Sequence, residues 1–314
     1  MHKIFLPVIC AIAVTIGFLS LYFVPFQIAE PQTVIIRSGA SLDRIGKDLA
    51  ERQVIKSALL FKVMTRFQGK ALTLQAGEYQ FIGAFSMYDV ARRLGEGDVV
   101  LHSLSLVEGQ TRSQFLNQLK AIDFLDGDID NAFGEGWLLP DTYRFERGTQ
   151  RQFVFNIMNA AMVSFLEDAW DRRADGLPFG SPEEALVLAS IVEKETGIAE
   201  ERGLVASVFI NRLNKNMRLQ SDPTIVYGLT NGEGALGRPI RKSEIRQPHS
   251  HNTYVIKGLP PTPIGYPGRA SILAVLNPLD SPYYYFVADG SGGHVFAETL
   301  AEHNLNVRKW RANR

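Results

Sequence analysis

Cysteine is almost missing from this chain: Cys10 is the single cysteine among 314 residues, and it lies in an apolar N-terminal run. The rest of the chain therefore has no thiol and can form no disulfide. This composition suits an oxidising compartment without requiring one.

An excess of positive charge is missing as well. Lysine and arginine together number 33 and aspartate and glutamate number 33, so the formal net charge is zero. A neutral chain lacks the basic field on which nucleic-acid binding depends, and we expect no nucleic-acid partner. The hydrophobic content of 46% excludes a disordered protein and is enough for one large domain or two ordinary ones.

A long uncharged run occurs at the N-terminus, from Ile4 to Phe26. Its 23 residues would form a helix of about 34 Å, enough to cross a hydrocarbon core of about 30 Å. A cleaved signal peptide is the alternative, but the run is long for one and no small-x-small cleavage site follows. We expect an uncleaved membrane anchor within residues 1–30, whose orientation the flanking charges leave undecided.

Residues 31–103 read as a small α+β unit with the order strand 33–36, helix 41–51, helix 57–67 and strand 77–81. With its opening "SGASLDRIGKDL", this order resembles the LysM module, which holds N-acetylglucosamine polymers. A generic small α+β subdomain fits the same pattern. The remaining residues, 104–314, read as a larger α+β domain with a helical core and short strands, so the fold class expected is α+β.

The stretch "ALVLASIVEKETG", residues 185–197, is the most informative part of the chain. Ser181 is placed to cap a helix, Pro182 suits its first position and Gly197 suits its end. The helix is apolar on every side and then reaches Glu193 and Glu195. Because charged carboxylates are rarely buried without a partner, this pair is the first candidate for chemistry.

Residues two apart on a helix point in different directions, so Glu193 and Glu195 cannot flank one sugar bond together. Glu193 shares its face with Ala189 and Ser190, which are small and would leave room for a substrate, whereas the face of Glu195 is bulky. We therefore predict Glu193 as the catalytic acid, with Glu195 as the alternative. Both could also be ordinary residues on a solvated helix end.

Two polar stretches further along the chain are candidates for substrate binding. The first, "LQSDPTIVYG", could bind sugar hydroxyls or form only a capped turn. The second, "HNTY", could bind substrate or contribute a core tyrosine. The predicted substrate-binding residues are Gln220, Ser221, Asp222, Thr224, Asn252 and Tyr254. His249 and His251 form a His-x-His pair, but no further ligand lies at a familiar spacing, and we expect neither a metal nor a cofactor.

Four blocks of sequence, "LASIVEKETG", "ASVFINRLNKNMRLQSDPTIVYG", "HNTYVIKGLPPTPIGYPGRASILAVLNP" and "YYYFVADGSGGHVFAETLAEHNLNV", resemble the successive motifs of the endolytic murein transglycosylase family, also called YceG-like proteins. "EGWLLPDTYRF" fits the same family. The family usually has Tyr-Asn-Thr-Tyr where this chain begins with His251. The resemblance extends over nearly the whole chain.

The resemblance implies a single-pass protein of the bacterial inner membrane with its catalytic domain in the periplasm. It implies cleavage of the β-1,4 bond between N-acetylmuramic acid and N-acetylglucosamine without water, giving 1,6-anhydro ends and terminating new glycan strands beside peptidoglycan synthases. It places the catalytic glutamate at Glu193. Two alternatives stay open: a non-catalytic peptidoglycan-binding scaffold, and a muramidase that uses water.

Overall fold

A computed structural model describes residues 13, 16–69, 73–130 and 133–312. The chain divides into two compact units, the first formed by Met1–Ser103 with Arg144–Thr149 and the second by Leu104–Tyr143 with Gln150–Arg314. The segment Arg144–Thr149 is tied to the first unit by Arg147, whose Nε donates a 2.6 Å hydrogen bond to Oε2 of Glu78. Helices and small sheets are mixed in both units, as the α+β expectation required.

The first unit has the predicted strand-helix-helix-strand order. Its elements are β1 (Phe26–Ile36), α2 (Leu42–Glu51), α3 (Ala58–Phe67), β2 (Gly77–Phe85) and α4 (Met87–Glu96). β1 and β2 pair antiparallel, and the buried side chains of both strands and of the three helices form one apolar cluster. β1 begins seven residues before the predicted strand, which started at residue 33.

The predicted membrane helix Ile4–Phe26 falls mostly on residues 4–12 and 14–15, which are outside the described residues. Within the described part, residues 16–23 are helical and Phe26 already belongs to β1. Tyr22 is fully buried in the apolar cluster of the first unit. Among the helices of the described residues, none is long and apolar enough to cross a membrane, so the structure does not support the predicted span.

Helices dominate the second unit. They are α5 (Arg112–Ala121), α6 (Arg151–Asp171), α7 (Pro182–Glu195), α8 (Ala199–Asn214), α9 (Asp222–Thr230), α10 (Lys242–Ile245), α11 (Arg269–Leu276) and α12 (Leu300–Ala312). The short strands are β3 (Leu101–Leu106), β4 (Leu125–Asp126), β5 (Asp141–Glu146), β6 (Thr149–Gln150), β7 (Tyr285–Ala288) and β8 (His294–Ala297). β3 pairs with β5 and β4 pairs with β6.

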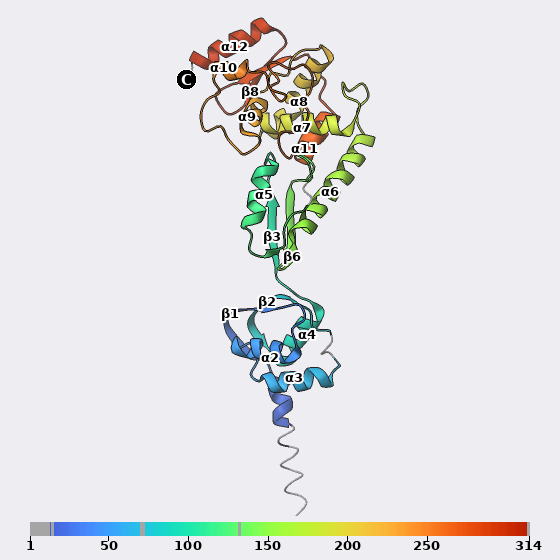
Figure 1. The fold of residues 1–314 in the computed structure, drawn as a ribbon, viewed down its shortest axis with the longest axis vertical. Helices are drawn as coiled ribbons and strands as arrows, with labels where there is room; N and C mark the ends of the chain where they lie inside the picture. The colour runs from blue at the N-terminus through green and yellow to red at the C-terminus, as the bar shows by residue number, and fades with distance from the viewer. Residues whose placement is uncertain (1–12, 14–15, 70–72, 131–132, 313–314) are drawn as a thin grey trace, which may run out of the picture. The chain divides into compact units, whose positions relative to one another are not determined.

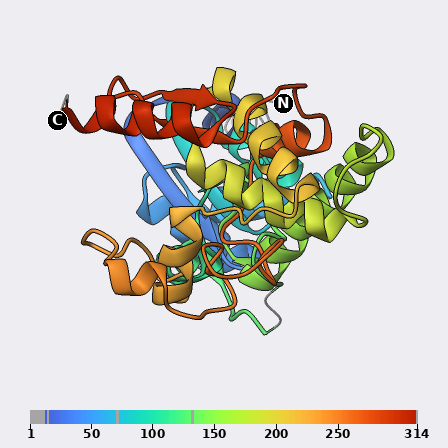
Figure 2. The ribbon, with the colours of Figure 1, turned by 90° about the horizontal axis from the view of Figure 1, so that it is seen from above.

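β7 pairs antiparallel with β8, and the two strands form a hairpin across the Gly-Ser-Gly-Gly segment 290–293. α12 packs on this hairpin, and Figure 2 shows it in dark red along one side of the unit.

α7 is the centre of the second unit's core. Every residue from Ala185 to Val192 is buried, and α8 and α11 pack against the helix. Such a helix must be apolar all round, which explains the sequence pattern. The predicted N-cap is confirmed, since Oγ of Ser181 accepts a 3.3 Å hydrogen bond from the amide of Glu184. The helix ends at Glu195, two residues before the predicted stop at Gly197.

Candidate functional site

The last turn of α7 directs Glu193 toward the start of another helix. Oε2 of Glu193 accepts a 2.9 Å hydrogen bond from the amide of Gly268, which is the N-cap residue of α11. Gly268 has no side chain with which to cap α11, and a carboxylate is stabilised at the positive end of a helix dipole. Glu193 therefore acts as the missing cap of α11.

The space expected beside Glu193 is filled by protein. Ser190, one helical turn earlier, is buried, and its Oγ accepts a 2.9 Å hydrogen bond from the amide of Ile264. The same hydroxyl donates to the carbonyl of Val187 at 2.7 Å. Glu108 also lies nearby, and its pKa is raised by burial and by the charge of Glu193. The segment 264–268 thus packs against the small residues of this face. The sequence near α7 does not show that this distant segment lies there.

Glu195 faces a different part of the chain, the start of α9. Its Oε1 accepts a 2.5 Å hydrogen bond from Oγ of Ser221, the N-cap residue of α9. Burial raises the pKa of Glu195 to about 7, and the charge of Asp222 adds to this while the Ser221 hydroxyl opposes it. A carboxyl with a pKa near 7 is suited to give and take a proton at neutral pH.

Tyr254 and Asp222 form a second polar pair next to Glu195. Oη of Tyr254 donates a 2.7 Å hydrogen bond to Oδ1 of Asp222. The segment before Tyr254 is tied to the same helix start, because Oγ1 of Thr253 accepts a 2.9 Å hydrogen bond from the amide of Ser221. The structure thus brings three of the six predicted substrate-binding residues, Ser221, Asp222 and Tyr254, to one place, beside Glu195.

The other three predicted substrate-binding residues serve the local backbone. Thr224 is fully buried, and its hydroxyl donates to the carbonyl of Ser221 at 2.6 Å. The amide of the buried Asn252 donates to three backbone carbonyls between residues 244 and 247. Gln220 adopts a left-handed conformation with φ of 53°, and its amide donates to the carbonyl of Thr253 at 3.2 Å. These contacts shape the loops that hold Ser221 and Tyr254.

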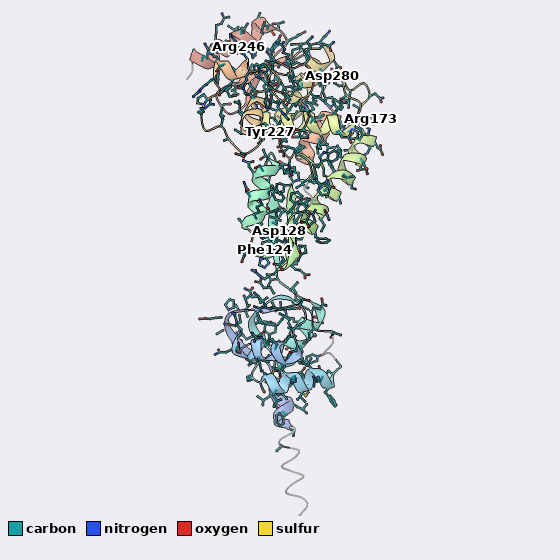
Figure 3. The ribbon with its side chains drawn as sticks, in the orientation of Figure 1. Phe124, Asp128, Arg173, Tyr227, Arg246 and Asp280 are labelled. Atoms are coloured by element: carbon teal, nitrogen blue, oxygen red, sulfur yellow. The ribbon has the colours of Figure 1, made fainter. Side chains whose placement is uncertain are left out.

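A pocket of about 380 Å³ opens beside the end of α7. It is lined by α9, which contributes Asp222 and Tyr227, and by the start of α5 with Thr111 and Gln114. Lys194 of α7 also lines it. Figure 3 labels Tyr227 in the second unit. Neither Glu193 nor Glu195 is among the lining residues. Glu195 is linked to the pocket wall through Ser221, whose neighbour Asp222 lines it.

Glu135 holds Tyr227 in the pocket wall, and the sequence analysis missed both residues. Its Oε2 accepts a 3.0 Å hydrogen bond from Oη of Tyr227, and its Oε1 accepts a 2.8 Å bond from the amide of Arg112. Burial raises the pKa of Glu135. Its signal in the sequence was a lone carboxylate between two glycines in the aromatic stretch "EGWLLPDTYRF".

His251 stands where the resembled family usually has tyrosine, and it packs on Tyr227. Its ring centroid lies 4.9 Å from that of Tyr227, and its Nε2 is 2.9 Å from Oγ1 of Thr262. Burial, with a further contribution from His249, lowers the pKa of His251 to about 4. Within the described residues no group of three or more His, Cys, Asp or Glu side chains is arranged to hold a metal ion.

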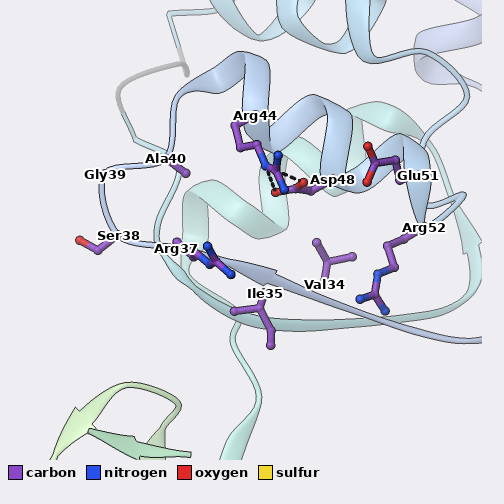
Figure 4. Close-up of a pocket in the computed structure, with 10 residues that line it drawn as sticks. All are labelled: Val34, Ile35, Arg37, Ser38, Gly39, Ala40, Arg44, Asp48, Glu51 and Arg52. Atoms are coloured by element: carbon purple, nitrogen blue, oxygen red, sulfur yellow. Dashed lines mark hydrogen bonds and ion pairs between the residues drawn. The ribbon is translucent and has the colours of Figure 1, made fainter. Parts of the chain in front are cut away.

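The first unit contains a larger and more polar pocket of about 720 Å³, beside the end of β1 and α2 (Figure 4). Arg37, Arg44 and Arg52 line it, and Nε of Arg44 is 2.9 Å from Oδ1 of Asp48. The pocket therefore carries polar and charged groups suited to a hydrated ligand.

Comparison with known proteins decides the family. The sequence model of the YceG-like family matches residues 34–309, which is most of the chain and includes every residue of the site described above. The chain belongs to the YceG-like family. A solved structure of a yceG-like protein from Listeria monocytogenes is similar to this one with a TM-score of 0.53 and 29% identity, covering 88% of this chain and 99% of that chain.

Two relatives of this YceG-like protein are named endolytic murein transglycosylase. The protein of Bacillus subtilis strain 168 is 30% identical over 309 residues, covering 88% of this chain and 83% of its own length. The protein of Streptococcus pneumoniae serotype 2 strain D39 is 30% identical over 326 residues, and the match covers 88% of this chain. This match spans only 57% of the pneumococcal protein.

Proposed function

We propose that this chain is an endolytic lytic transglycosylase that cleaves the glycan strands of peptidoglycan. The names of the Bacillus and Streptococcus relatives support the reaction class, and the family match extends over the site. A pocket of about 380 Å³ beside a carboxyl with a pKa of about 7 fits a sugar-cleaving enzyme. A scaffold that only holds glycan would have no need of such a carboxyl.

The proton donor that we propose is Glu195. This proposal depends on the surroundings of its carboxyl, which is bonded to Ser221 and flanked by the Tyr254 hydroxyl and by Asp222, a residue of the pocket wall. Glu193, the residue predicted from the sequence, is the competing candidate. Its carboxylate accepts the amide that begins α11, and this structural duty is a reason to prefer Glu195.

In the proposed reaction, protonated Glu195 gives its proton to the glycosidic oxygen as the bond to the anomeric carbon of N-acetylmuramic acid breaks. The C6 hydroxyl of the same sugar then forms a new bond to the anomeric carbon, and its proton passes to the Glu195 carboxylate. Atoms balance without water, and the products are a free 4-hydroxyl and a 1,6-anhydro end. An internal nucleophile needs no second carboxylate to position it, because it is already held at high effective concentration.

We further propose that the protein is anchored in the membrane and acts on new glycan strands in the periplasm. The uncharged run Ile4–Phe26 has the composition and length of a membrane anchor. We place the second unit in the periplasm because the relatives are named for murein, which lies on that side of the membrane. The first unit has the β-α-α-β order of a LysM-like module and a polar pocket, features that suit it to holding glycan. Cleavage of new strands beside peptidoglycan synthases would then terminate their growth.

The experiment uses the full-length protein with purified sacculi and detects products by mass spectrometry. We expect anhydro-muramyl ends from the wild type and a loss of at least about 10²-fold in Glu195→Gln, since this is the usual contribution of a general acid. Glu193→Gln is the matched variant, changing the same atoms on the same helical turn. It should retain cleavage and show lower thermal stability.

Three outcomes would change the proposal. If Glu193→Gln lost cleavage and Glu195→Gln retained it, the catalytic role would belong to Glu193. Reducing ends in place of anhydro ends would identify a hydrolase. Binding of sacculi with no product from the wild type would favour the scaffold.

A further inference from the structure

Lys194 is the cationic group of the 380 Å³ pocket, and it lies between the two glutamates discussed above. Its side chain is exposed on the pocket side of α7. Within the described residues, no carboxylate lies within ion-pair distance of its ammonium group. Partial burial lowers the pKa of the ammonium group, and the negative charges of Glu135 and Glu193 oppose this lowering.

The stem of Lys194 is held by close backbone contact. A Cβ atom placed on Gly265 would lie 3.3 Å from Cε of Lys194, and one placed on Gly109 would lie 3.8 Å from its Cδ. These two glycines therefore leave space for the methylene chain to pass along the backbone. The side chain, which lines the pocket, is therefore positioned by packing and, among the described residues, by no ion pair.

Gln114 adds a neutral donor to the lining of the same pocket. Oε1 of Gln114 accepts a 3.0 Å hydrogen bond from the amide of Thr111, which fixes the orientation of the side-chain amide. Within the described part of the chain its Nε2 has no bonding partner, and both residues line the pocket. Thr111 itself is anchored by donating its hydroxyl to the carbonyl of Gly232. The ammonium group of Lys194 and Nε2 of Gln114 are donors suited to an anion.

The pocket is lined by groups of both charges. Asp222 lies at the start of α9, near Glu195, whereas Lys194 and Gln114 belong to α7 and α5. A sugar whose glycosidic oxygen lies near Glu195 could direct a negatively charged substituent away from Asp222 and toward Lys194. Muramyl residues of peptidoglycan carry such substituents: the acidic stem peptide or, where the peptide is absent, the free carboxylate of the lactyl group.

We propose that Lys194, with Gln114, forms a subsite that binds a carboxylate of the muramyl residue or its stem peptide. This inference rests on the proposed function, because it takes the glycan strand as the ligand of the pocket. The subsite would position the muramyl residue on the correct side of the scissile bond. Lys194 is thus assigned to substrate specificity, whereas Glu195 carries the proton.

The test compares kinetics of the full-length protein on solubilised glycan strands whose carboxylates are free or have been amidated with carbodiimide and ammonia. Lys194→Met should raise KM about tenfold on the free substrate, equivalent to about 1.4 kcal/mol, with kcat nearly unchanged. Lys194→Arg should recover most of the affinity. Lys215→Met removes an exposed lysine of the same unit and should match the wild type.

The comparison of free with amidated strands decides whether Lys194 binds a carboxylate. The wild type should bind amidated strands as weakly as Lys194→Met does, and amidation should leave Lys194→Met unaffected. Strands stripped of peptides by an amidase separate the two sources, since they lose the peptide carboxylates and gain a free lactyl carboxylate. If Lys194→Met lost affinity equally for free and amidated strands relative to the wild type, the subsite would be overturned and Lys194 would have only a structural role.

Binding distinguishes failure of the subsite from failure of the proposed function. If the wild type releases no anhydro product, the function fails, and affinities for intact strands are measured with Glu195→Gln and with Glu195→Gln/Lys194→Met. About tenfold weaker binding by the double variant would still support the carboxylate subsite. Equal affinities would overturn it.

Discussion

Oγ of Ser221 donates a 2.5 Å hydrogen bond to Oε1 of Glu195, joining the end of α7 to the beginning of α9. An N-cap hydroxyl ordinarily accepts from an amide of its own helix, but Ser221 makes no such side-chain bond. Its hydroxyl instead fixes the orientation of the carboxyl. Oε1 is thereby occupied, and the other oxygen of Glu195 is the one suited to carry the catalytic proton.

The pKa of Glu195 predicts how activity depends on pH. A general acid must be protonated, so kcat/KM should fall above pH about 7, about tenfold per pH unit. Ser221→Ala removes a bond that lowers this pKa and should move the alkaline limb to higher pH. Asp222→Asn removes a charge that raises it and should move the limb to lower pH. Profiles of anhydro-end formation measure both, and shifts in the same direction would contradict the assignment.

The same pKa predicts a loss of stability at high pH. The folded state holds the Glu195 proton up to pH about 7, whereas the ordinary value is 4.5. The stabilising effect is complete below pH 4.5 and is lost as pH rises through 7, because the unfolded chain then ionises more easily. The loss is on the order of 3 kcal/mol.

Glu195→Gln should remove this pH-dependent loss, so the variant should become the more stable protein above pH about 7. Denaturant unfolding of the full-length protein at several pH values between 4 and 9 provides the measurement. Glu200→Gln, on an exposed residue of α8, controls for the change in charge. Parallel stability curves for the wild type and Glu195→Gln would show that the carboxyl is not buried in solution.

Local chemistry accounts for what the sequence predicted of α7. Ser181 and Pro182 act within one helical turn, and the all-round apolar pattern follows from burial on every side. The β-α-α-β order of the first unit was also predictable, since strand and helix periodicities are local. These features needed no knowledge of distant contacts.

The environment of each glutamate was not predictable in this way. The helix periodicity showed that Glu193 and Glu195 point apart, but the residues they meet are Gly268 and Ser221, which are 75 and 26 positions away. The small side chain of Ser190 suggested an open face because the sequence does not show that Ile264 bonds to it. Tertiary partners that helix periodicity does not reveal thus determine the surroundings of each carboxyl.

Glu135 and Tyr227 should be energetically coupled. Tyr227→Phe removes the hydroxyl that donates to Glu135, and Glu135→Ala leaves both the Arg112 amide and the tyrosine unpaired. A buried polar group without a partner costs about 1–3 kcal/mol, so Glu135→Ala should cost more than Tyr227→Phe. A double-mutant cycle by denaturant unfolding measures the coupling, and a value of zero would show that the hydrogen bond contributes nothing.

Gly265 is expected to tolerate no side chain, because its neighbours are backbone atoms. A Cβ there would lie 2.9 Å from the carbonyl oxygen of Gly109 and 3.1 Å from that of Gln110. Those two residues exchange hydrogen bonds with Tyr266 at 2.8 and 2.7 Å, so they cannot retreat without breaking the pairing. Gly265→Ala should therefore destabilise the protein by about 1–3 kcal/mol and, by displacing the Lys194 stem, should weaken binding to glycan strands.

Gly180→Ala is the matched control for this last substitution. A Cβ on Gly180 would meet nothing within 4 Å, and this residue lies just before α7 in the same unit. Its substitution should leave the unfolding midpoint and strand binding close to those of the wild type. If Gly265→Ala matched Gly180→Ala in both measurements, the contact between the 109–110 and 265–266 segments would be looser than described. The packing that directs Lys194 into the pocket would then lose its support, whereas the contacts of Glu195, which involve neither segment, would stand.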